Sequence, residues 1–253
     1  MSREQLKKEL EARLDRSKMP THIGIIMDGN GRWAKSLGKS RLKGHQQGAR
    51  RIKAIIRYSN AIGIKHVSLY AFSVENWSRP PFEVYALMKL LKTYLIQQRN
   101  ELHEEGVVFR LVGRRDNLPA EIVKEAEIST KLMQNNTGLN LNLCFNYGGR
   151  AEIVDAVKKI VQSGISPDRI TEETIRQNLY WPEIPDVDLM IRTSGEMRTS
   201  NFHLWRCAYS ELYFTPVFWP DFDEAELLNA ILTFQGRERR FGLTSAQLGS
   251  QES

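Results

Sequence analysis

A carboxylate and a guanidinium flank a glycine-rich turn near the start of the chain. Asp28 precedes the turn over 29–31, and Arg32 follows it. An apolar run over 23–27 leads into the turn and a helical pattern follows, so free backbone N–H groups should lie at the helix start. Such N–H groups and arginine bind phosphate oxygens, and Mg²⁺ is commonly held by a carboxylate together with phosphate. The turn therefore predicts a site for a phosphate group with a divalent metal.

The same turn matches the glycine pattern of dinucleotide-binding loops, but its surroundings argue against such a site. Residues 29–34 fit G-x-G-x-x-[GA]. A dinucleotide site needs an acidic residue about 20 positions later to bind the ribose, and the segment 49–53 is basic instead. A bare pyrophosphate would also repel Asp28 unless a metal ion lay between them. An Asx turn without any ligand is the alternative that the loop alone leaves open.

Two other loops rich in polar side chains follow predicted strands. The first, 73–79, combines hydroxyl, carboxylate, amide, indole and guanidinium groups, and the second, 192–200, has two arginines six residues apart. Asn76 can relay a proton, Trp77 can cover an apolar chain, and the arginines can clamp a second anion. The alternatives are a surface loop with a packed tryptophan for the first and a loop ion-paired through Glu196 for the second.

Charged residues outside these loops add two further candidates. A basic segment with Arg41, Lys43 and His45 can bind the distal side of the same phosphate group, although a solvated linker explains the segment equally well. Glu211 begins an apolar strand, where a carboxylate is either ion-paired or a metal ligand. Taken alone, the residue favours the ion pair.

The elements that position these loops alternate between strand and helix, which predicts an α/β fold. Strands are expected over 23–27, 67–72, 107–112, 139–145, 188–192 and 211–218, and helices over 3–16, 45–60, 81–105, 119–133, 151–162, 171–179 and 223–239. No repeat or domain boundary interrupts the pattern, so we expect one domain with a six-stranded, mostly parallel sheet flanked by about seven helices. Loops after parallel strands share one edge of the sheet, where ligands bind.

The apolar faces of two helices carry expectations of their own. The helix over 81–105 has a wide apolar face, which favours core packing over a ligand channel. The helix over 151–162 is amphipathic. Its residues expected to face inward are Ile153, Val154, Val157 and Val161.

Composition narrows the class of protein. The chain has 253 residues, a net charge of +6 and a pI of about 9.3, which suits phosphorylated ligands, nucleic acid or an anionic surface. The basic residues are scattered, so a nucleic-acid stripe is not favoured. No apolar run approaches the ~20 residues of a membrane span, and the charged segment 1–18 is unlike a signal peptide, which predicts a cytoplasmic protein. Cys144 and Cys207 lack metal-binding spacing and are expected to be reduced thiols.

Several motifs together resemble the cis-prenyltransferase family, and within it the bacterial undecaprenyl diphosphate synthases. They are HIGIIMDGNGRWA (22–34), LYAFSVENWSRP (69–80), NYGGR (146–150), DLMIRTSGEMRTSNF (188–202), ELYFT (211–215), WPDF (219–222) and RERRFG (237–242). The chain lacks Asp-Asp-x-x-Asp, which argues against a trans-prenyltransferase. Met197 stands where some members have histidine, so no metal or proton role is expected there.

The resemblance implies condensation of isopentenyl diphosphate onto an allylic diphosphate, usually farnesyl diphosphate, with a cis double bond formed at each addition. The implied product is undecaprenyl diphosphate, used for the lipid carrier of cell-wall synthesis. The resemblance also implies Mg²⁺ as cofactor, an apolar tunnel for the growing chain and a homodimer. We also expect a transient contact with the inner membrane face for product release. No nucleic acid partner is expected.

The resemblance assigns roles to individual residues. Asp28 and Asn76 are expected to be catalytic, and Asp28 and Glu211 to bind Mg²⁺. The allylic substrate would be held by Gly29, Asn30, Gly31, Arg32, Trp33, Arg41, His45, Ser73, Val74, Glu75, Trp77 and Arg79, and isopentenyl diphosphate by Arg192, Arg198, Thr199 and Ser200. Since an amide is a weak base, we hypothesise that released diphosphate, not Asn76, accepts the proton.

The predicted organisation is an N-terminal amphipathic helix within 1–18, a catalytic domain over 19–242 and a disordered tail over 243–253. Two other functions were weighed. A non-catalytic partner subunit of the same fold should lack the Asp28 loop, which this chain has. A nucleotide- or nucleic-acid-binding protein would need an acidic ribose partner or a basic stripe, and neither is evident.

Overall fold

Six parallel strands form a single sheet in the computed structural model, which describes residues 2–237. The strands are β1 (His22–Ile26), β2 (His66–Ser73), β3 (Val108–Val112), β4 (Asn140–Tyr147), β5 (Leu189–Arg192) and β6 (Glu211–Phe214). Their order is β3-β4-β2-β1-β5-β6, and every pair is parallel. The α/β class and the six strands are therefore confirmed, with a wholly parallel sheet where a mostly parallel one was expected.

Nine α-helices connect and cover the strands within the described residues. They are α1 (Arg3–Ala12), α2 (Asn30–Ser36), α3 (Arg41–Ala61), α4 (Pro81–Gln97), α5 (Arg99–Glu104), α6 (Ala120–Met133), α7 (Gly149–Gln162), α8 (Glu172–Asn178) and α9 (Glu224–Gln235). The expected helix over 81–105 is two helices that meet at Gln98. The expected basic linker before 45 belongs to α3, which starts at Arg41, so Arg41 and His45 share one helix.

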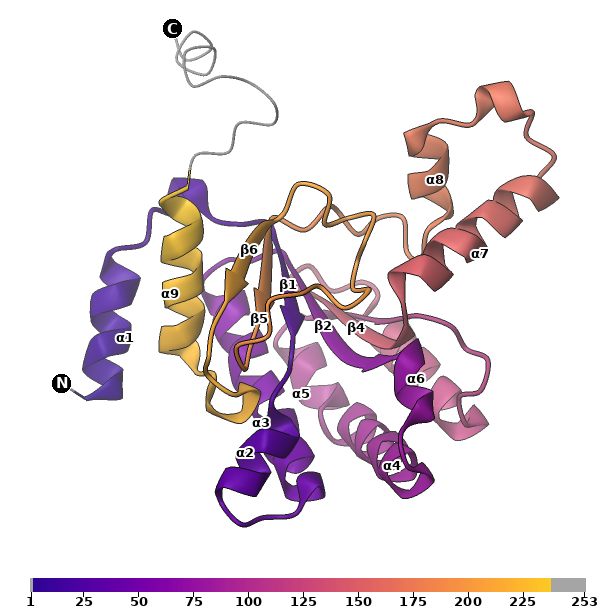
Figure 1. Cartoon of the computed structure of the whole chain (residues 1–253). Coiled ribbons are helices and arrows are strands. Elements are labelled where there is room, and N and C mark those ends of the chain that lie inside the picture. Colours follow the sequence, from indigo (N-terminus) through magenta and orange to yellow (C-terminus); the bar gives the residue numbers. More distant parts are fainter. Residues whose placement is uncertain (1, 238–253) are drawn as a thin grey trace, which may run out of the picture.

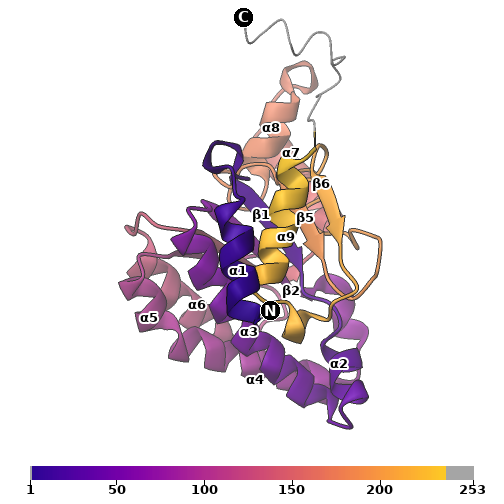
Figure 2. The same ribbon diagram turned by 90° about the vertical axis from the view of Figure 1, so that its left-hand side faces the viewer.

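The sheet has two unlike faces (Figure 1). One is covered by α3, α4, α6 and α9, whose buried leucines and isoleucines join those of the central strands in a large apolar core. The other face packs a smaller cluster that includes Cys144, Tyr147 and Phe202. A view at right angles shows α1 lying beside α9 (Figure 2), where Leu10 is buried.

The expected inward face of α7 is wrong for its three valines, whereas Ile153, the fourth residue expected there, is partly buried. Val154, Val157 and Val161 are 49%, 44% and 72% exposed. The helix buries Gly149, Ala156, Ile160 and Glu152 instead. The Glu152 carboxylate can be buried because it is paired with the equally buried Arg206, with Oε1 and Nη1 3.2 Å apart. A buried charge needs such a partner, and the pair fixes the rotation of the helix.

Both cysteines are free thiols, as expected. None of the helices within residues 2–237 is long and apolar enough to cross a membrane. The three-part division of the chain stays a prediction: its tail over 243–253, the last residues of its catalytic domain and most of the RERRFG motif lie outside the described residues.

Candidate active site

Strand pairing brings the first and last polar loops together. In the register of β1 with β5, Ile26 lies opposite Arg192, so Asp28 and Arg192 leave the sheet side by side. Arg192 Nη2 donates to Asp28 Oδ2 at 2.9 Å, and Nη1 donates to Ser200 Oγ at 2.6 Å. Arg192 is itself buried, so its planar guanidinium is held in place and links the two loops by hydrogen bonds.

Asp28 is charged and accessible. Burial would raise the pKa of this carboxyl, but the hydrogen bond and charge of Arg192, the Gly29 N–H and the nearby Arg32 outweigh burial and hold the pKa below its ordinary value. Its side chain keeps 31% exposure. Gly29 has φ +100°, and a Cβ there would lie 2.7 Å from Phe218, so the turn requires glycine.

A second acidic residue sits between the two outer arginines of this group. Arg32 Nη1 lies 3.3 Å from Glu196 Oε1, and Arg198 is ion-paired with the other oxygen. Arg32 also donates to the Ser194 hydroxyl at 2.5 Å. The ion pairing through Glu196, which was the alternative explanation of the loop over 192–200, is therefore present. Both arginines remain partly exposed and free to meet an anion. We call Asp28, Arg32, Arg192 and Arg198 the first cation cluster.

A second cation cluster surrounds Glu83, which the sequence analysis did not single out. Glu83 Oε1 lies 3.0 Å from Arg41 Nε, 3.1 Å from Arg79 Nη1 and 3.7 Å from His45 Nε2. The Glu83 side chain is only 8% exposed. Burial lowers the pKa of His45 to about 4 although Glu83 acts in the opposite direction, so the imidazole is neutral near pH 7. The cluster therefore holds two cations and one neutral donor around a buried carboxylate.

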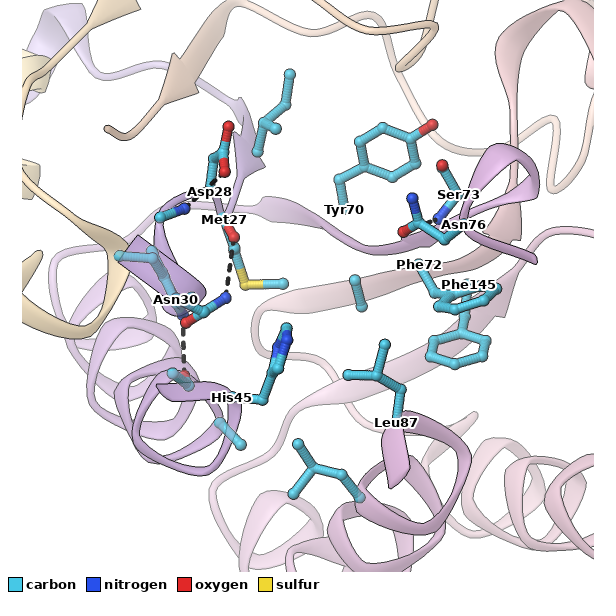
Figure 3. Close-up of a pocket in the computed structure, with 18 of the residues that line it drawn as sticks. Met27, Asp28, Asn30, His45, Tyr70, Phe72, Ser73, Asn76, Leu87 and Phe145 are labelled. Atoms are coloured by element: carbon cyan, nitrogen blue, oxygen red, sulfur yellow. Dashed lines mark hydrogen bonds between the residues drawn. The ribbon is translucent and has the colours of Figure 1, made fainter. Parts of the chain in front are cut away.

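Arginines of both clusters line one pocket of about 870 Å³. Figure 3 shows Asp28 of the first cluster and His45 of the second among its lining residues. Its polar part is lined by the loops after β1, β2 and β5 and by the start of α3. Its apolar part is lined by Ile52, Phe72, Leu87, Leu91 and Phe145. The wide face of α4 therefore serves as both core and pocket wall. Such a volume is at the upper end of small-molecule sites, and its division into charged and apolar parts suits an amphiphilic ligand with anionic groups.

Comparison with known proteins identifies the family. The family model described as "putative undecaprenyl diphosphate synthase", Prenyltransf, matches residues 26–242. The chain belongs to this prenyltransferase family. It is 50% identical over 224 residues to an isoprenyl transferase of Fusobacterium nucleatum, covering 88% of this chain and 96% of the relative. It is 44% identical to a farnesyl-diphosphate-specific ditrans,polycis-undecaprenyl-diphosphate synthase of Vibrio cholerae, covering 93% and 96%.

Solved structures agree with this assignment. Lavandulyl diphosphate synthase from Lavandula x intermedia, in complex with dimethylallyl diphosphate, has a TM-score of 0.85 and 37% identity, covering 89% of this chain and 99% of that one. A probable undecaprenyl diphosphate synthase from Campylobacter jejuni has a TM-score of 0.76 and 30% identity, covering 88% and 98%. The predicted cis-prenyltransferase family and fold are confirmed.

Most residues predicted for the prenyltransferase site meet in the pocket. Those lining it are Asp28, Gly29, Asn30, Gly31, Arg32, Arg41, His45, Ser73, Glu75, Asn76, Arg79, Arg192, Arg198 and Ser200. Five of the predicted residues lie outside its lining: Trp33, Val74, Trp77, Thr199 and Glu211. Their roles stay predictions, as do those of the residues that line the pocket.

The amide of Asn76 is oriented by its own loop. Its Oδ1 accepts from the Ser73 N–H at 3.2 Å within a capping box, which leaves the NH₂ group as the free end. Trp77 is held nearby, since its indole N–H donates to Asn146 Oδ1 at 2.8 Å. Asn146 adopts a left-handed conformation, φ 51°, and also donates to the Asp116 carbonyl at 2.8 Å.

Asn201 bridges two loops and was missed by the sequence analysis. Its Nδ2 donates to Glu75 Oε1 at 2.8 Å, and its Oδ1 accepts from the Arg150 N–H at 2.8 Å. Asn201 and the preceding Ser200 both have positive φ, 65° and 48°. Asparagine tolerates that conformation better than most residues. In the sequence, only its position directly after the loop over 192–200 marked Asn201 as a candidate. That position did not predict its contact with Glu75.

Glu211 lies far from Asp28 along the strands. It opens β6 opposite Leu189, the first residue of β5, whereas Asp28 follows the other end of β1. Its Oε2 lies 2.7 Å from Arg237 Nη1, which agrees with the ion pair favoured by the residue alone. Among residues 2–237 no three His, Cys, Asp or Glu side chains gather as a metal site. Asp28 is thus the one predicted metal ligand that faces the pocket.

Proposed function

We propose that this chain is a cis-prenyltransferase that elongates an allylic diphosphate, most simply farnesyl diphosphate, with isopentenyl diphosphate until it forms undecaprenyl diphosphate. That product would supply the lipid carrier of cell-wall synthesis. One observation carries the proposal: Asp28 and two cation clusters lie at the polar end of a pocket whose other end is apolar. Two anionic head groups and one hydrocarbon chain match this division.

Arg32 of the first cluster would join the second cluster around one substrate, and the other arginines of the first cluster would hold the second substrate. Arg32, Arg41, Arg79 and neutral His45 would hold the allylic diphosphate, and Arg192, Arg198 and Ser200 would hold isopentenyl diphosphate. The C–O bond of the allylic diphosphate breaks, and its electron pair stays on the leaving oxygen. The arginines stabilise that developing negative charge in a partly buried site, where electrostatic stabilisation is strongest. The double bond of isopentenyl diphosphate then forms the new C–C bond, and a proton leaves.

Asn76 would act as a donor in this step. Because its oxygen already accepts from Ser73 N–H, its NH₂ group is free to bind a diphosphate oxygen. A neutral amide is also a weak base. We therefore keep the released diphosphate as the proton acceptor, with Asn76 holding that diphosphate in place.

Mg²⁺ fits the residues around Asp28. A half-exposed, ionised carboxylate beside arginines matches the usual mode in which Mg²⁺ binds one or two carboxylates plus substrate phosphates. When bound, Mg²⁺ supplies positive charge that makes diphosphate a better leaving group. Asp28 would hold it with the diphosphates. Glu211 lies at the opposite end of the strands, so it could share that ion only if a second copy of the chain contributed it.

We also propose a cytoplasmic homodimer that touches the inner membrane face transiently and binds no nucleic acid. The exposed apolar stripe of Val154, Val157 and Val161 on α7 supports the dimer, because exposed apolar patches commonly mark protein contacts. Light scattering on the Val157→Ser/Val161→Ser variant would measure this. If the variant remained a dimer, the interface would not be formed by this stripe of α7.

Incubation with farnesyl diphosphate, isopentenyl diphosphate and Mg²⁺, followed by mass spectrometry of the products, examines the function. We expect chains that grow by five carbons to a 55-carbon product, no elongation with EDTA, and loss of elongation in Asp28→Ala. Absence of elongation, or a product made from allylic diphosphates alone, would refute the proposal.

A further inference from the structure

Nine consecutive residues joining α2 to α3 are exposed and strongly basic. The segment 35–43, KSLGKSRLK, has four cationic side chains, two leucines and no acidic residue. Leu37 and Leu42 are 51% and 42% exposed. Leucines exposed among lysines are typical of segments that lie on anionic lipid surfaces, where cations meet head groups and apolar side chains enter the boundary.

The first turns of α4 continue this composition. Phe82 and Tyr85 are 76% and 72% exposed, and Lys89 is also exposed. The only acidic residue among 79–89 is Glu83, which is turned inward and buried. Aromatic side chains that are not needed for the core are well suited to the interface between water and lipid.

The two segments are neighbours in space. Arg41 of the basic segment is ion-paired with Glu83, which stands between Phe82 and Tyr85 in sequence, at 3.0 Å. Both views place the α2–α3 connection and α4 at the same end of the molecule (Figures 1 and 2). We call residues 35–43 with Phe82, Tyr85 and Lys89 the basic apolar patch. The acidic Asp221 is exposed beside the patch: it accepts from the Trp33 indole at 2.9 Å, and the Lys39 ammonium lies 5.2 Å from the centroid of that ring.

The basic apolar patch borders the pocket. Lys35 and Arg41 of the patch line the pocket, as do Leu87 and Leu90 of α4. We propose that this patch docks the protein on an anionic lipid surface, with the pocket held beside that surface. The proposal rests on the proposed function for its purpose, since a polyprenyl product is apolar along nearly its whole length and must pass into lipid.

Charge and shape together favour lipid as the partner. The patch carries five cationic side chains, four in 35–43 and Lys89. Two carboxylates lie near it: Glu83, which is already neutralised by arginines, and Asp221, which accepts from Trp33. The α2–α3 connection projects from the body (Figure 1). It therefore presents leucines and lysines to a broad surface, and an anionic bilayer is complementary to it in both charge and apolarity.

Vesicle flotation measures this docking. The full chain is mixed with vesicles of phosphatidylcholine alone or with one quarter phosphatidylglycerol, at low and high salt. We expect binding only to the anionic vesicles, weakened by salt. Phe82→Ser/Tyr85→Ser and Lys39→Glu/Lys89→Glu should each weaken binding about tenfold or more. Ile128→Ser/Leu132→Ser, which alters two exposed apolar side chains on α6, is the matched control and should bind as the unaltered chain does.

The outcomes separate docking from catalysis. Folding of each variant is checked by thermal unfolding, and turnover of soluble substrates in detergent should be unchanged, because none of the altered residues belongs to the proposed site. Equal binding of patch variants and the unaltered chain, or equal loss in the α6 control, would overturn the proposal. So would failure to float with anionic vesicles, as expected if an acidic protein were the partner. Absent turnover with normal flotation would refute the catalytic proposal alone.

Discussion

Two carboxylates each gather arginines that line the pocket, but Asp28 itself lines the pocket and Glu83 does not, and they differ in accessibility. Asp28 is 31% exposed and bonded to Arg192, whereas Glu83 is 8% exposed and surrounded by Arg41, Arg79 and His45. The exposed carboxylate has oxygen surface left for a metal ion. The buried one is already used as a counter-charge that keeps cations assembled before substrate binds. Two acids beside one pocket thus serve different purposes because their surroundings differ.

The largest effect should come from the exposed carboxylate. Asp28→Asn keeps the shape of the side chain but removes its charge. We expect kcat to fall about 10³-fold, or about 4 kcal/mol in the activation free energy, because the metal loses its protein ligand. Steady-state kinetics over a range of Mg²⁺ concentrations measures this. If excess Mg²⁺ restored kcat fully, Asp28 would only raise metal affinity, and the contrast with Glu83 would weaken.

A smaller loss is expected when the bridge between the two substrate loops is broken. Asn201→Asp places a second carboxylate against Glu75 and should lower kcat/KM about tenfold or more. Glu75→Gln should also lower it. The double variant restores an amide–carboxylate pair in the reverse sense, so its loss should be less than the product of the single losses. The coupling free energy should be about 1 kcal/mol. Multiplicative losses would mean that the two loops act independently.

The buried carboxylate should affect stability and binding in opposite directions. Glu83→Gln leaves two arginines without their counter-charge, so the free protein should lose about 1–3 kcal/mol of unfolding free energy. A diphosphate would then replace the missing negative charge. Thermal unfolding should accordingly show a larger stabilisation by farnesyl diphosphate in the variant than in the unaltered chain. An equal or smaller stabilisation would show that Glu83 is not interchangeable with the ligand's charge.

The smallest effect concerns His45. Its pKa is lowered to about 4, below that of a free histidine, so it is neutral from pH 6 to 8 and gains its proton only as pH falls toward 4. A neutral N–H donor contributes about 0.5–1.5 kcal/mol. His45→Gln should therefore raise the allylic KM about two- to tenfold without changing the pH profile between 6 and 8. A transition near pH 6.5 that disappears in the variant would show that the histidine is charged in function.

Features that depend on local chemistry could be predicted from the sequence, and features that depend on packing could not. The Asp28 loop and the 73–79 loop were found because acidic and basic residues, joined by glycines in the Asp28 loop, closely follow apolar strands. The inward face of α7 was wrong because apolar periodicity assumes that only apolar side chains are buried. Glu152 is buried by pairing with Arg206, which is 54 positions away and invisible to a local pattern.

The sequence alone determined the strand–helix alternation, the family motifs and the chemical groups of the pocket, because these depend on residue type and short spacing. The tertiary structure decided which loops meet. Strand order places β5 beside β1, so Arg192 reaches Asp28 across 164 positions. It also decided that Glu83 turns inward to two arginines and that Glu211 stays at the far end of the sheet. Charges interact through distance in space, which chain order does not specify.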